Sequence, residues 1–225
     1  MIELSKRLSL IAELVNEGSS VCDVGTDHGY LPAFLYLSGK CKKVTATDIN
    51  QKPLESAKAN LARLGVDKVK LILCDGLASV ARQDADTVII AGMGGEVIRG
   101  IISRAEFLRD NTVSLILQPT TTAKELRQYL AQNGFSVEKE QAIRENGKIY
   151  SVMLARFSGS PYTISDTQAV IGILKPNYDE AIQYINKQYK IIDKCAHDLE
   201  NVPRKQNEYK HYLKLSEELK NILGG

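Results

Sequence analysis

The chain has 225 residues, of which 44% are hydrophobic and 25% are charged, values that exclude a wholly disordered or fibrous protein. This length suits one large domain, or one domain with an appendage. Lysine and arginine total 29 against 27 acidic residues, so the net charge is only +2 and the chain as a whole lacks the basic excess common in nucleic-acid-binding proteins.

The chain up to residue 119 alternates predicted helices with short apolar strands. Leu4, Leu8, Ile11 and Val15 recur at helical spacing and predict an amphipathic helix that ends before Gly18. Strands are expected at residues 19–25, 44–49, 69–74, 86–92 and 114–119. Further helices are expected at 31–39, from an Asn50 cap to Gly65, at about 77–82, from Gly95 to Ile102, and at 123–133. This order is typical of a parallel sheet with helices on both faces.

The alternation stops after Gly134. Residues 136–144 and 149–157 are two predicted strands with no helix between them, and Asn146-Gly147 at their junction strongly indicates a hairpin turn. The sequence therefore predicts an α/β fold with a mostly parallel sheet and an antiparallel hairpin at one edge. A plain doubly wound dehydrogenase domain would more often stay parallel.

The last part of the chain has helical patterns only. Ser158-Gly159-Ser160-Pro161 resembles a linker. The helix after it carries a heptad-like seam of Tyr178, Ile182, Ile185, Tyr189, Ile192, Ala196 and Leu199. Beyond a break at Asn201-Val202-Pro203, a second helix carries a looser apolar stripe. We expect an antiparallel helical hairpin or coiled coil, with a domain of residues 1–157 followed by a linker and helical segment of residues 158–225.

The first predicted strand runs into the turn Asp23-Val24-Gly25-Thr26-Asp27-His28-Gly29-Tyr30, whose glycines let a ligand approach the backbone. The turn differs from the dinucleotide motif GxGxxG because Asp27 takes the place of the second glycine. A carboxylate there repels a pyrophosphate but suits S-adenosylmethionine, which has a sulfonium centre and no phosphate. The structural alternative is an ordinary tight turn with Asp27 as a helix cap.

Polar or glycine-rich turns also end the other strands, at the edge where a doubly wound sheet binds ligands. Asp48 is placed to accept hydrogen bonds from ribose hydroxyls, and Asp75 from an adenine amino group. The turn Ala91-Gly92-Met93-Gly94-Gly95 permits close backbone approach, and Gln118-Pro119 ends the fifth strand. The structural alternatives are a helix cap for Asp48 and ordinary turns for the others.

Together these motifs resemble the bacterial tRNA (adenine-22-N1)-methyltransferase family, TrmK. The matching segments are Leu4-Ser5-Lys6-Arg7-Leu8, DVGTDHGYLP at 23–32, the Asp75-Gly76 turn, IAGMGG at 90–95, LILQP at 115–119, Glu145-Asn146-Gly147-Lys148 and Tyr150. The resemblance covers about residues 1–157 and implies a class I methyltransferase fold. Many amino-directed methyltransferases carry an Asn/Asp-Pro-Pro-aromatic motif after the fourth strand, whereas AGMGG stands there in this chain and suits a ring-nitrogen target.

The resemblance also implies S-adenosyl-L-methionine as cofactor and a set of residues for each role. Gly25, Asp48 and Asp75 would contact the cofactor, while Asp23 and the Met93 turn would border the transferred methyl group. The full expected cofactor site is Asp23, Gly25, Asp48, Ile49, Asp75, Gly76 and Gly92. The expected catalytic residues are Asp27 and Met93. The expected substrate contacts are Lys6, Arg7, His28, Tyr30, Gly94, Gln118 and Pro119.

Methylation of adenine N1 needs little chemical assistance, because N1 has an in-plane lone pair and carries no proton. The product is a cationic base, so the Asp27 carboxylate is a candidate for stabilising the developing charge, or for orienting the ring through its N6 amine. Tyr30 is a candidate for stacking on the flipped adenine, with core packing as the alternative. For His28, the alternative to assistance is a helix-start histidine satisfied by the backbone.

Basic side chains provide candidate phosphate contacts, with solvated surface charges as the alternative. Besides Lys6 and Arg7, they are Lys40, Lys42, Lys43, Arg99, Arg104 and, in the helical segment, Lys187, Lys190, Lys194, Arg204, Lys205, Lys210 and Lys214. The helical segment is expected either to embrace tRNA or to serve as a brace or dimerisation coiled coil.

The remaining predictions concern compartment, partners and competing functions. The four cysteines form no CxxC pair, which predicts no metal site and favours a reduced compartment. Without a signal-peptide pattern or a membrane-spanning run, we expect a cytoplasmic monomer or weak homodimer that binds tRNA. The competing functions are methyl transfer to another acceptor, non-catalytic tRNA binding, and nicotinamide oxidoreduction, which Asp27 disfavours.

Overall fold

The structure is a computed structural model that describes residues 2–224, and within them the chain forms one seven-stranded sheet of order β3-β2-β1-β4-β5-β7-β6. The strands are β1 (Ser19–Val24), β2 (Cys41–Asp48), β3 (Val69–Leu73), β4 (Thr87–Met93), β5 (Ser114–Pro119), β6 (Phe135–Glu145) and β7 (Lys148–Phe157). β1 to β5 are parallel, whereas β7 runs antiparallel to both β5 and β6. The expected α/β fold, with a mostly parallel sheet and an antiparallel hairpin at one edge, is confirmed.

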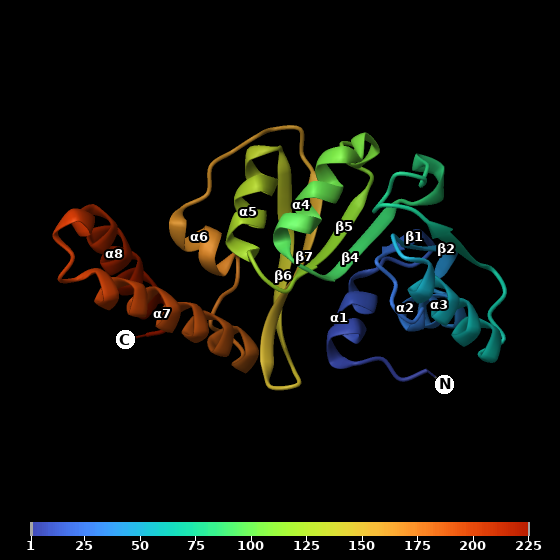
Figure 1. Cartoon of the computed structure of the whole chain (residues 1–225), viewed down its shortest axis with the longest axis horizontal. Helices are drawn as coiled ribbons and strands as arrows, with labels where there is room; N and C mark the ends of the chain where they lie inside the picture. The colour runs from blue at the N-terminus through green and yellow to red at the C-terminus, as the bar shows by residue number, and fades with distance from the viewer. Residues whose placement is uncertain (1, 225) are drawn as a thin grey trace.

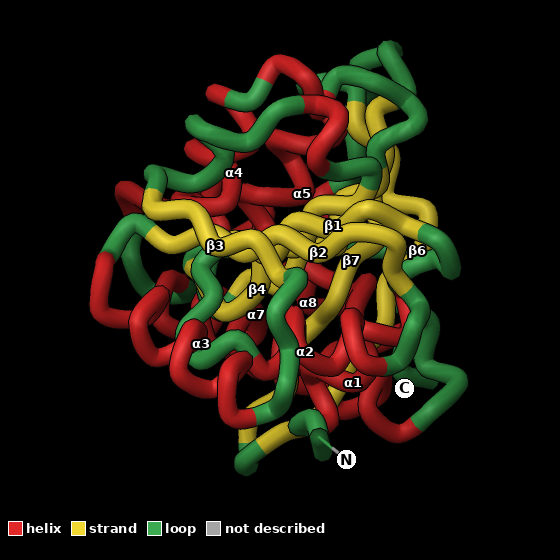
Figure 2. Tube along the Cα trace, turned by 90° about the vertical axis from the view of Figure 1, so that its right-hand side faces the viewer, coloured by secondary structure: helices red, strands yellow, loops and turns green. Residues whose placement is uncertain are grey.

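Helices cover both faces of the sheet, which is seen nearly edge-on in Figure 2. The covering helices are α1 (Lys6–Leu14), α2 (Tyr30–Leu37), α3 (Gln51–Arg63), α4 (Gly95–Arg104) and α5 (Ala123–Gln132). α1, α2 and α3 lie on one face, and α4 and α5 lie on the other. Neighbouring strand residues point to opposite faces, so Ile89 packs with α1 and α2 while Ile90 packs with α4 and α5. Burial on both faces explains why the central strands are almost continuously apolar.

Two local predictions are wrong. Residues 77–79 form a turn, residues 80 and 81 are irregular, and a short 3₁₀ helix, η1 (Arg82–Asp84), takes the place of the end of the predicted helix. The Asp84 carboxylate accepts the backbone N–H of Ala81 at 3.3 Å, which favours this turn over a longer helix. Asn50 stands at the start of α3 but makes no capping bond through its side chain; instead, the Asp48 carboxylate accepts the Asn50 backbone N–H at 2.8 Å.

The predicted hairpin turn is confirmed. Asn146 and Gly147 have φ values of 49° and 74°, and both residues of a two-residue type I′ turn need such positive values. The hairpin tip extends beyond the other strands at the lower edge of the sheet in Figure 1. No helix among residues 2–224 is both long enough and apolar enough to cross a membrane.

The last helices form an antiparallel pair that projects from the β6 side of the molecule (Figure 1). They are α7 (Asp179–Leu199) and α8 (Gln206–Ile222), joined by η3 (Pro203–Lys205). A shorter helix, α6 (Asp166–Ile171), precedes them and was not predicted. The predicted seam is only partly right, because Ile182 is 41% exposed whereas Ala181 and Tyr184 are buried. The start of α7 packs on β6 and α6 before it meets α8, so its buried face differs from a coiled-coil seam.

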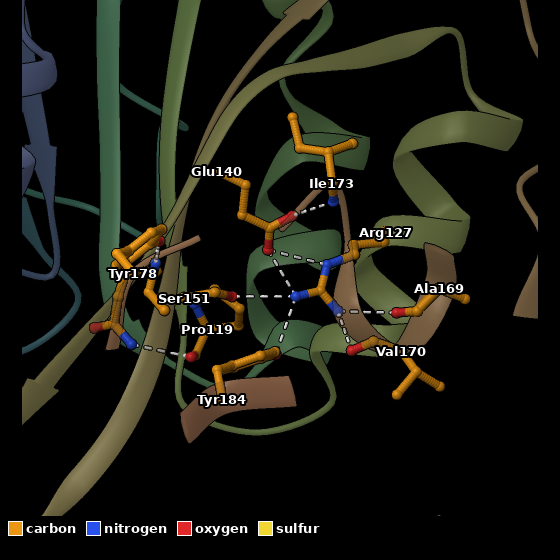
Figure 3. Close-up of polar contacts among 11 residues, drawn as sticks. Pro119, Arg127, Glu140, Ser151, Ala169, Val170, Ile173, Tyr178 and Tyr184 are labelled. Atoms are coloured by element: carbon orange, nitrogen blue, oxygen red, sulfur yellow. Dashed lines mark hydrogen bonds and ion pairs between the residues drawn. The ribbon is translucent and has the colours of Figure 1, made fainter. Parts of the chain in front are cut away.

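A buried ion pair attaches these helices to the sheet (Figure 3). Arg127 of α5 pairs with Glu140 of β6 at 2.6 Å, and both side chains are almost fully buried. The guanidinium also donates to the Tyr184 hydroxyl of α7 at 3.0 Å. Its other acceptors are Ser151 Oγ and the backbone oxygens of Ala169 and Val170. One charged group therefore links α5, β6, β7, α6 and α7, and we call these residues the Arg127 cluster.

Candidate active site

The carboxyl ends of β1 and β4 border a cavity of about 400 Å³. This volume lies within the usual range for small-molecule sites. The cavity is lined by Arg7, Leu8, Asp23, Gly25, Thr26, Asp27, His28, Gly29, Tyr30, Leu31, Ala91 and Gly92. The structure thus brings together α1, the turn between β1 and α2, and the end of β4, at the sheet edge expected to bind ligands.

Glycines shape both turns of this cavity. Gly25 and Gly92 have φ values of +78° and +79°, a region that residues with a side chain rarely adopt. A Cβ atom on Gly25 would lie 2.1 Å from Met93 Cε, so the Met93 side chain lies across the first turn. The backbone N–H groups of Gly25 and Thr26 both donate to Thr47 O, at 2.8 and 3.0 Å, which ties the turn to β2.

Asp23 is the buried acid of the cavity. Its residue is only 6% exposed, and this burial raises the pKa of its carboxyl to about 6. A hydrogen bond from the Thr26 side chain partly offsets the shift, and the negative charge of Asp48 adds to it. The sequence analysis assigned no role to Thr26, although a hydroxyl three residues after an aspartate near the end of a strand is well placed for such a bond. A buried carboxyl with a shifted pKa in a cavity is typical of a functional site.

Asp27, His28 and Tyr30 stand at the rim of the cavity. The Asp27 side chain is 78% exposed and its Oδ2 lies 3.3 Å from His28 Nε2. The His28 and Tyr30 rings are tilted, with centroids 5.9 Å apart. The alternatives for these residues are wrong, because Asp27 makes no capping bond to α2, the His28 ring pairs with Asp27 instead of the backbone, and Tyr30 is 39% exposed.

The other expected cofactor residues lie further along the same sheet edge, outside the lining of the cavity. Ile49 follows β2 and is 63% exposed. Asp48 accepts the N–H of Asn50, which is a local turn bond and not the helix cap of its structural alternative. Asp75 accepts a 2.9 Å hydrogen bond from Arg104, and the Gly76 carbonyl accepts one of 2.9 Å from the Thr47 hydroxyl. These contacts hold the ends of β2 and β3 beside the cavity.

The expected substrate contacts at the end of β5 differ in their surroundings. Pro119 lines the cavity between β5 and α7 that is described below. Gln118 is fully buried, and its amide already has partners at both ends. Its Oε1 accepts the Gly92 N–H at 3.0 Å and an Arg7 N–H at 2.5 Å, while its Nε2 donates to Pro119 O at 2.9 Å. Gly94 is half-buried at the start of α4, where a Cβ would lie 3.0 Å from Thr121 Oγ1.

The predicted phosphate contacts outside the helical segment lie in several different places. Lys40, Lys42 and Lys43 lie at the start of β2, the opposite end of the sheet from the cavity. Arg99 pairs with Glu96, and Arg104 with Asp75. Arg7 is half-buried and paired with Glu145, a residue to which the sequence assigned no role. Lys6 is exposed and lies in a shallow groove with the hairpin tip.

A second cavity, of about 390 Å³, opens between the end of β5 and α7. The residues after β5 that line it include Thr120, Thr121 and Lys124, and α7 contributes Lys187. The Thr120 N–H donates to Met93 O at 2.8 Å and the Gly95 N–H donates to Thr121 O at 2.9 Å. Backbone hydrogen bonds therefore connect the loop that lines the second cavity to the Met93 turn beside the first cavity.

Comparison with known proteins places these turns in a family. Residues 4–153 match the family described as Methyltransferase domain. The tRNA (adenine(22)-N(1))-methyltransferase of Bacillus subtilis is 34% identical over 155 residues, which are 68% of this chain. The matched part spans 65% of that curated relative, slightly less than two thirds of its length.

Solved structures extend the similarity to the helical segment. The B. subtilis M1A22 tRNA methyltransferase TrmK has a TM-score of 0.87 at 25% identity, over 99% of this chain and 100% of that one. Streptococcus pneumoniae Sp1610 in complex with S-adenosyl-L-methionine has a TM-score of 0.82 at 29% identity, over 98% of this chain and 100% of that one. The family match covers more than half of the chain and includes both glycine turns of the cavity, so the chain belongs to the methyltransferase domain family.

Proposed function

We propose that this protein transfers a methyl group from S-adenosyl-L-methionine to N1 of adenine 22 in tRNA. The observation that carries the proposal is the cavity that joins the Gly25 turn to the Gly92 turn at the carboxyl edge of the sheet. The similarity to the B. subtilis enzyme of that name, and the shared fold along nearly the whole chain, support this acceptor over others.

The residues at this edge fit the cofactor. Gly25 and Gly92 leave the backbone open to close approach. Asp23 is a buried carboxyl that a cationic group would stabilise in its charged form. Ile49 offers an exposed apolar surface to a nucleoside, and Asp48 lies beside it as an acceptor for ribose hydroxyls. When bound, the cofactor supplies a methyl group attached to a positively charged sulfur.

The side chains of the cavity and of the adjoining Met93 turn then have separable tasks. Asp23 balances the positive charge on the cofactor side, while Met93, packed on Gly25, shapes the wall beside the methyl group. Tyr30 offers an exposed ring on which the adenine can stack. Asp27 stabilises the positive charge that appears on the methylated base, and His28 holds the Asp27 carboxylate in place. The N1 lone pair needs no general base, so positioning supplies most of the rate.

The second cavity suits the nucleotides next to the target. A base within folded tRNA must be flipped out, which costs a few kcal/mol. Thr120, Thr121, Lys124 and Lys187 offer hydroxyls and positive charge for a ribose-phosphate backbone, and Tyr150 offers an aromatic ring. We propose that this groove and the helical segment beside it hold the RNA while the adenine occupies the first cavity.

The test uses unmodified tRNA transcripts and labelled S-adenosylmethionine, followed by nucleoside analysis. We expect N1-methyladenosine on the natural transcript and none when adenine 22 is replaced by guanine. Methylation that survives the replacement would show another acceptor. Binding of the cofactor and tRNA without any transfer would favour a non-catalytic module, and calorimetric preference for NAD over S-adenosylmethionine would overturn the cofactor assignment.

A further inference from the structure

Arg7, in the first turn of α1, is bonded to two elements far from it in the sequence. Its backbone N–H donates to Glu145 Oε1 at 3.0 Å, and its Nε donates to Glu145 Oε2 at 3.2 Å. Its Nη1 donates to Gln118 Oε1 at 2.5 Å. The guanidinium carbon lies 5.9 Å from the centroid of the Tyr150 ring. Arg7 thus joins α1 to the hairpin tip and to the end of β5.

Gln118 carries this connection on to the cavity. Its Oε1 also accepts the backbone N–H of Gly92 at 3.0 Å, and its Nε2 donates to Pro119 O at 2.9 Å. The side chain is fully buried, so the amide has no water to replace a lost partner. The Arg7 N–H therefore helps to keep the amide oxygen turned toward Gly92.

Gly92 lies where the ladder between β4 and β5 is irregular. Ala91 pairs with Gln118 and Met93 pairs with Pro119, so Gly92 is an extra residue with no partner on β5. Bulges of this kind often occur next to active sites, where they redirect a side chain. The Gln118 amide gives the Gly92 N–H the partner that the ladder does not provide.

The next residue after the bulge is Met93, whose Cε rests on Gly25. We propose that Arg7 is a positioning residue for methyl transfer, acting through Gln118 on the bulge that places Gly92 and Met93 against the Gly25 turn; this inference rests on the proposed function. Arginine suits this role better than lysine because its planar fork bonds Glu145 and Gln118 at once, whereas a single ammonium group would keep only part of these bonds.

The same geometry argues against a phosphate contact for Arg7. The side chains of Arg7 and Glu145 are only 23% and 13% exposed, and they neutralise each other. Burial alone would raise the pKa of Glu145, but hydrogen bonds from Ser5 and Arg7 outweigh it and hold that pKa below its usual range. The carboxylate therefore stays charged and paired with Arg7 at neutral pH.

The experiment compares Arg7→Gln and Arg7→Lys with a matched control, Arg82→Gln, in the full chain. Arg82 pairs with Asp110 at 2.9 Å and donates to the Thr112 hydroxyl, away from the cavity. We expect Arg7→Gln to lower the single-turnover rate of methyl transfer about 10- to 100-fold, with the KM for tRNA changed less than about twofold. Arg7→Lys should recover part of the rate, and Arg82→Gln should keep all of it.

A second readout does not depend on catalysis. Exchange of the Gly92 amide hydrogen, followed by NMR, should be faster in Arg7→Gln and unchanged in Arg82→Gln, because only the first variant frees the Gln118 amide. If the wild-type chain methylates no tRNA, the proposed function fails, while this exchange still shows whether Arg7 positions the Gly92 bulge through Gln118.

Three results would overturn the inference. The first is unchanged Gly92 exchange in Arg7→Gln. The second is a raised KM for tRNA with an unchanged single-turnover rate and a salt dependence reduced by about one phosphate contact, which would make Arg7 an RNA ligand. The third is a rate loss no greater than that of Arg82→Gln at equal loss of thermal stability, which would make Arg7 a structural tie only.

Discussion

Burial changes the acidity of a single residue of the cavity, Asp23. Its pKa rises from 3.8 to about 6 in the folded chain. The fold therefore favours the protonated carboxyl, so its contribution to stability is full below about pH 4 and is lost as pH rises through 6. A bound cation favours the charged carboxylate instead, and it must displace the proton whenever the pH is below 6.

The first prediction concerns this linkage between protons and cofactor. The affinity for S-adenosylmethionine should fall as pH is lowered from 7 to 5, approaching tenfold per pH unit below pH 6. Calorimetric titration across this range measures the effect. Asp23→Asn should bind more weakly at pH 7 and lose the pH dependence, while Asp67→Asn, on an exposed loop, should behave as wild type. Equal pH slopes in wild type and Asp23→Asn would assign the titration to another group.

The second prediction concerns the contact between Gly25 and Met93. Gly25→Ala should cost about 1–2 kcal/mol in the free energy of unfolding and weaken cofactor binding, because an L residue is strained at φ +78° and its Cβ meets Met93 Cε. In a Met93→Ala background the clash with the Met93 side chain is gone and only the backbone strain is left, so Gly25→Ala should lower the free energy of unfolding by less in that background. Denaturant titrations of the two single variants and the double variant measure this coupling, and strict additivity would contradict it.

At the scale of elements, the sequence predicted the strands of the parallel sheet, most of the helices around it and the hairpin. The apolar runs and the Asn146-Gly147 turn each have one strong local cause, so local patterns suffice for them. No helix forms at 77–82, where Leu77 and Val80 are buried without one and Asp84 accepts the N–H of Ala81 at the start of η1, because burial alone does not define a helix. The bulge at Gly92 depends on Gln118 in another strand, so no local pattern reveals it.

The third prediction concerns the start of α4. A Cβ on Gly95 would lie 2.3 Å from Thr122 O, a backbone atom that cannot move aside alone. Gly95→Ala should therefore destabilise the protein by about 1–3 kcal/mol and disturb the Met93 turn that precedes the helix.

The same helix offers the control. A Cβ on Gly100 would point into open space, with no heavy atom of another segment within 4 Å. Gly100→Ala should therefore stabilise the protein by up to about 1 kcal/mol through helix propensity. Urea denaturation of both variants gives the comparison. A Gly95→Ala variant as stable as Gly100→Ala would show that the start of α4 and the loop at Thr122 can move apart without a loss of stability.

At the scale of the whole molecule, the Arg127 cluster decides how the helical segment meets the sheet. Burial alone would lower the pKa of Arg127, but Glu140 and Tyr184 outweigh it and raise that pKa above its usual range. The sequence predicted two helices at the end of the chain, but an arginine and a glutamate resemble exposed residues in a sequence pattern. Their burial follows only from three-dimensional packing, and so the attachment of the helices was not predicted.

The fourth prediction tests this attachment. Arg127→Met should cost about 3–5 kcal/mol, because it leaves the Glu140 charge buried without its partner. The double variant Arg127→Met/Glu140→Leu should recover much of that loss. Chemical denaturation measures both, and limited proteolysis should cut the segment between Phe157 and α6 faster in the single variant. Equal stability of the single and double variants would contradict the buried-charge explanation.

The Arg127 cluster also has a mechanical consequence. α7 spans 21 residues, about 30 Å at 1.5 Å per residue, and Tyr184 near its start is bonded to the cluster. The helix pair is therefore fixed at its base, and we expect its far end to move by bending of the helices instead of rotation about a hinge. If the helical segment holds RNA as proposed, the fixed base of α7 sets the distance between the far end of the helix pair and the cavity, and this distance would contribute to the choice of the target nucleotide.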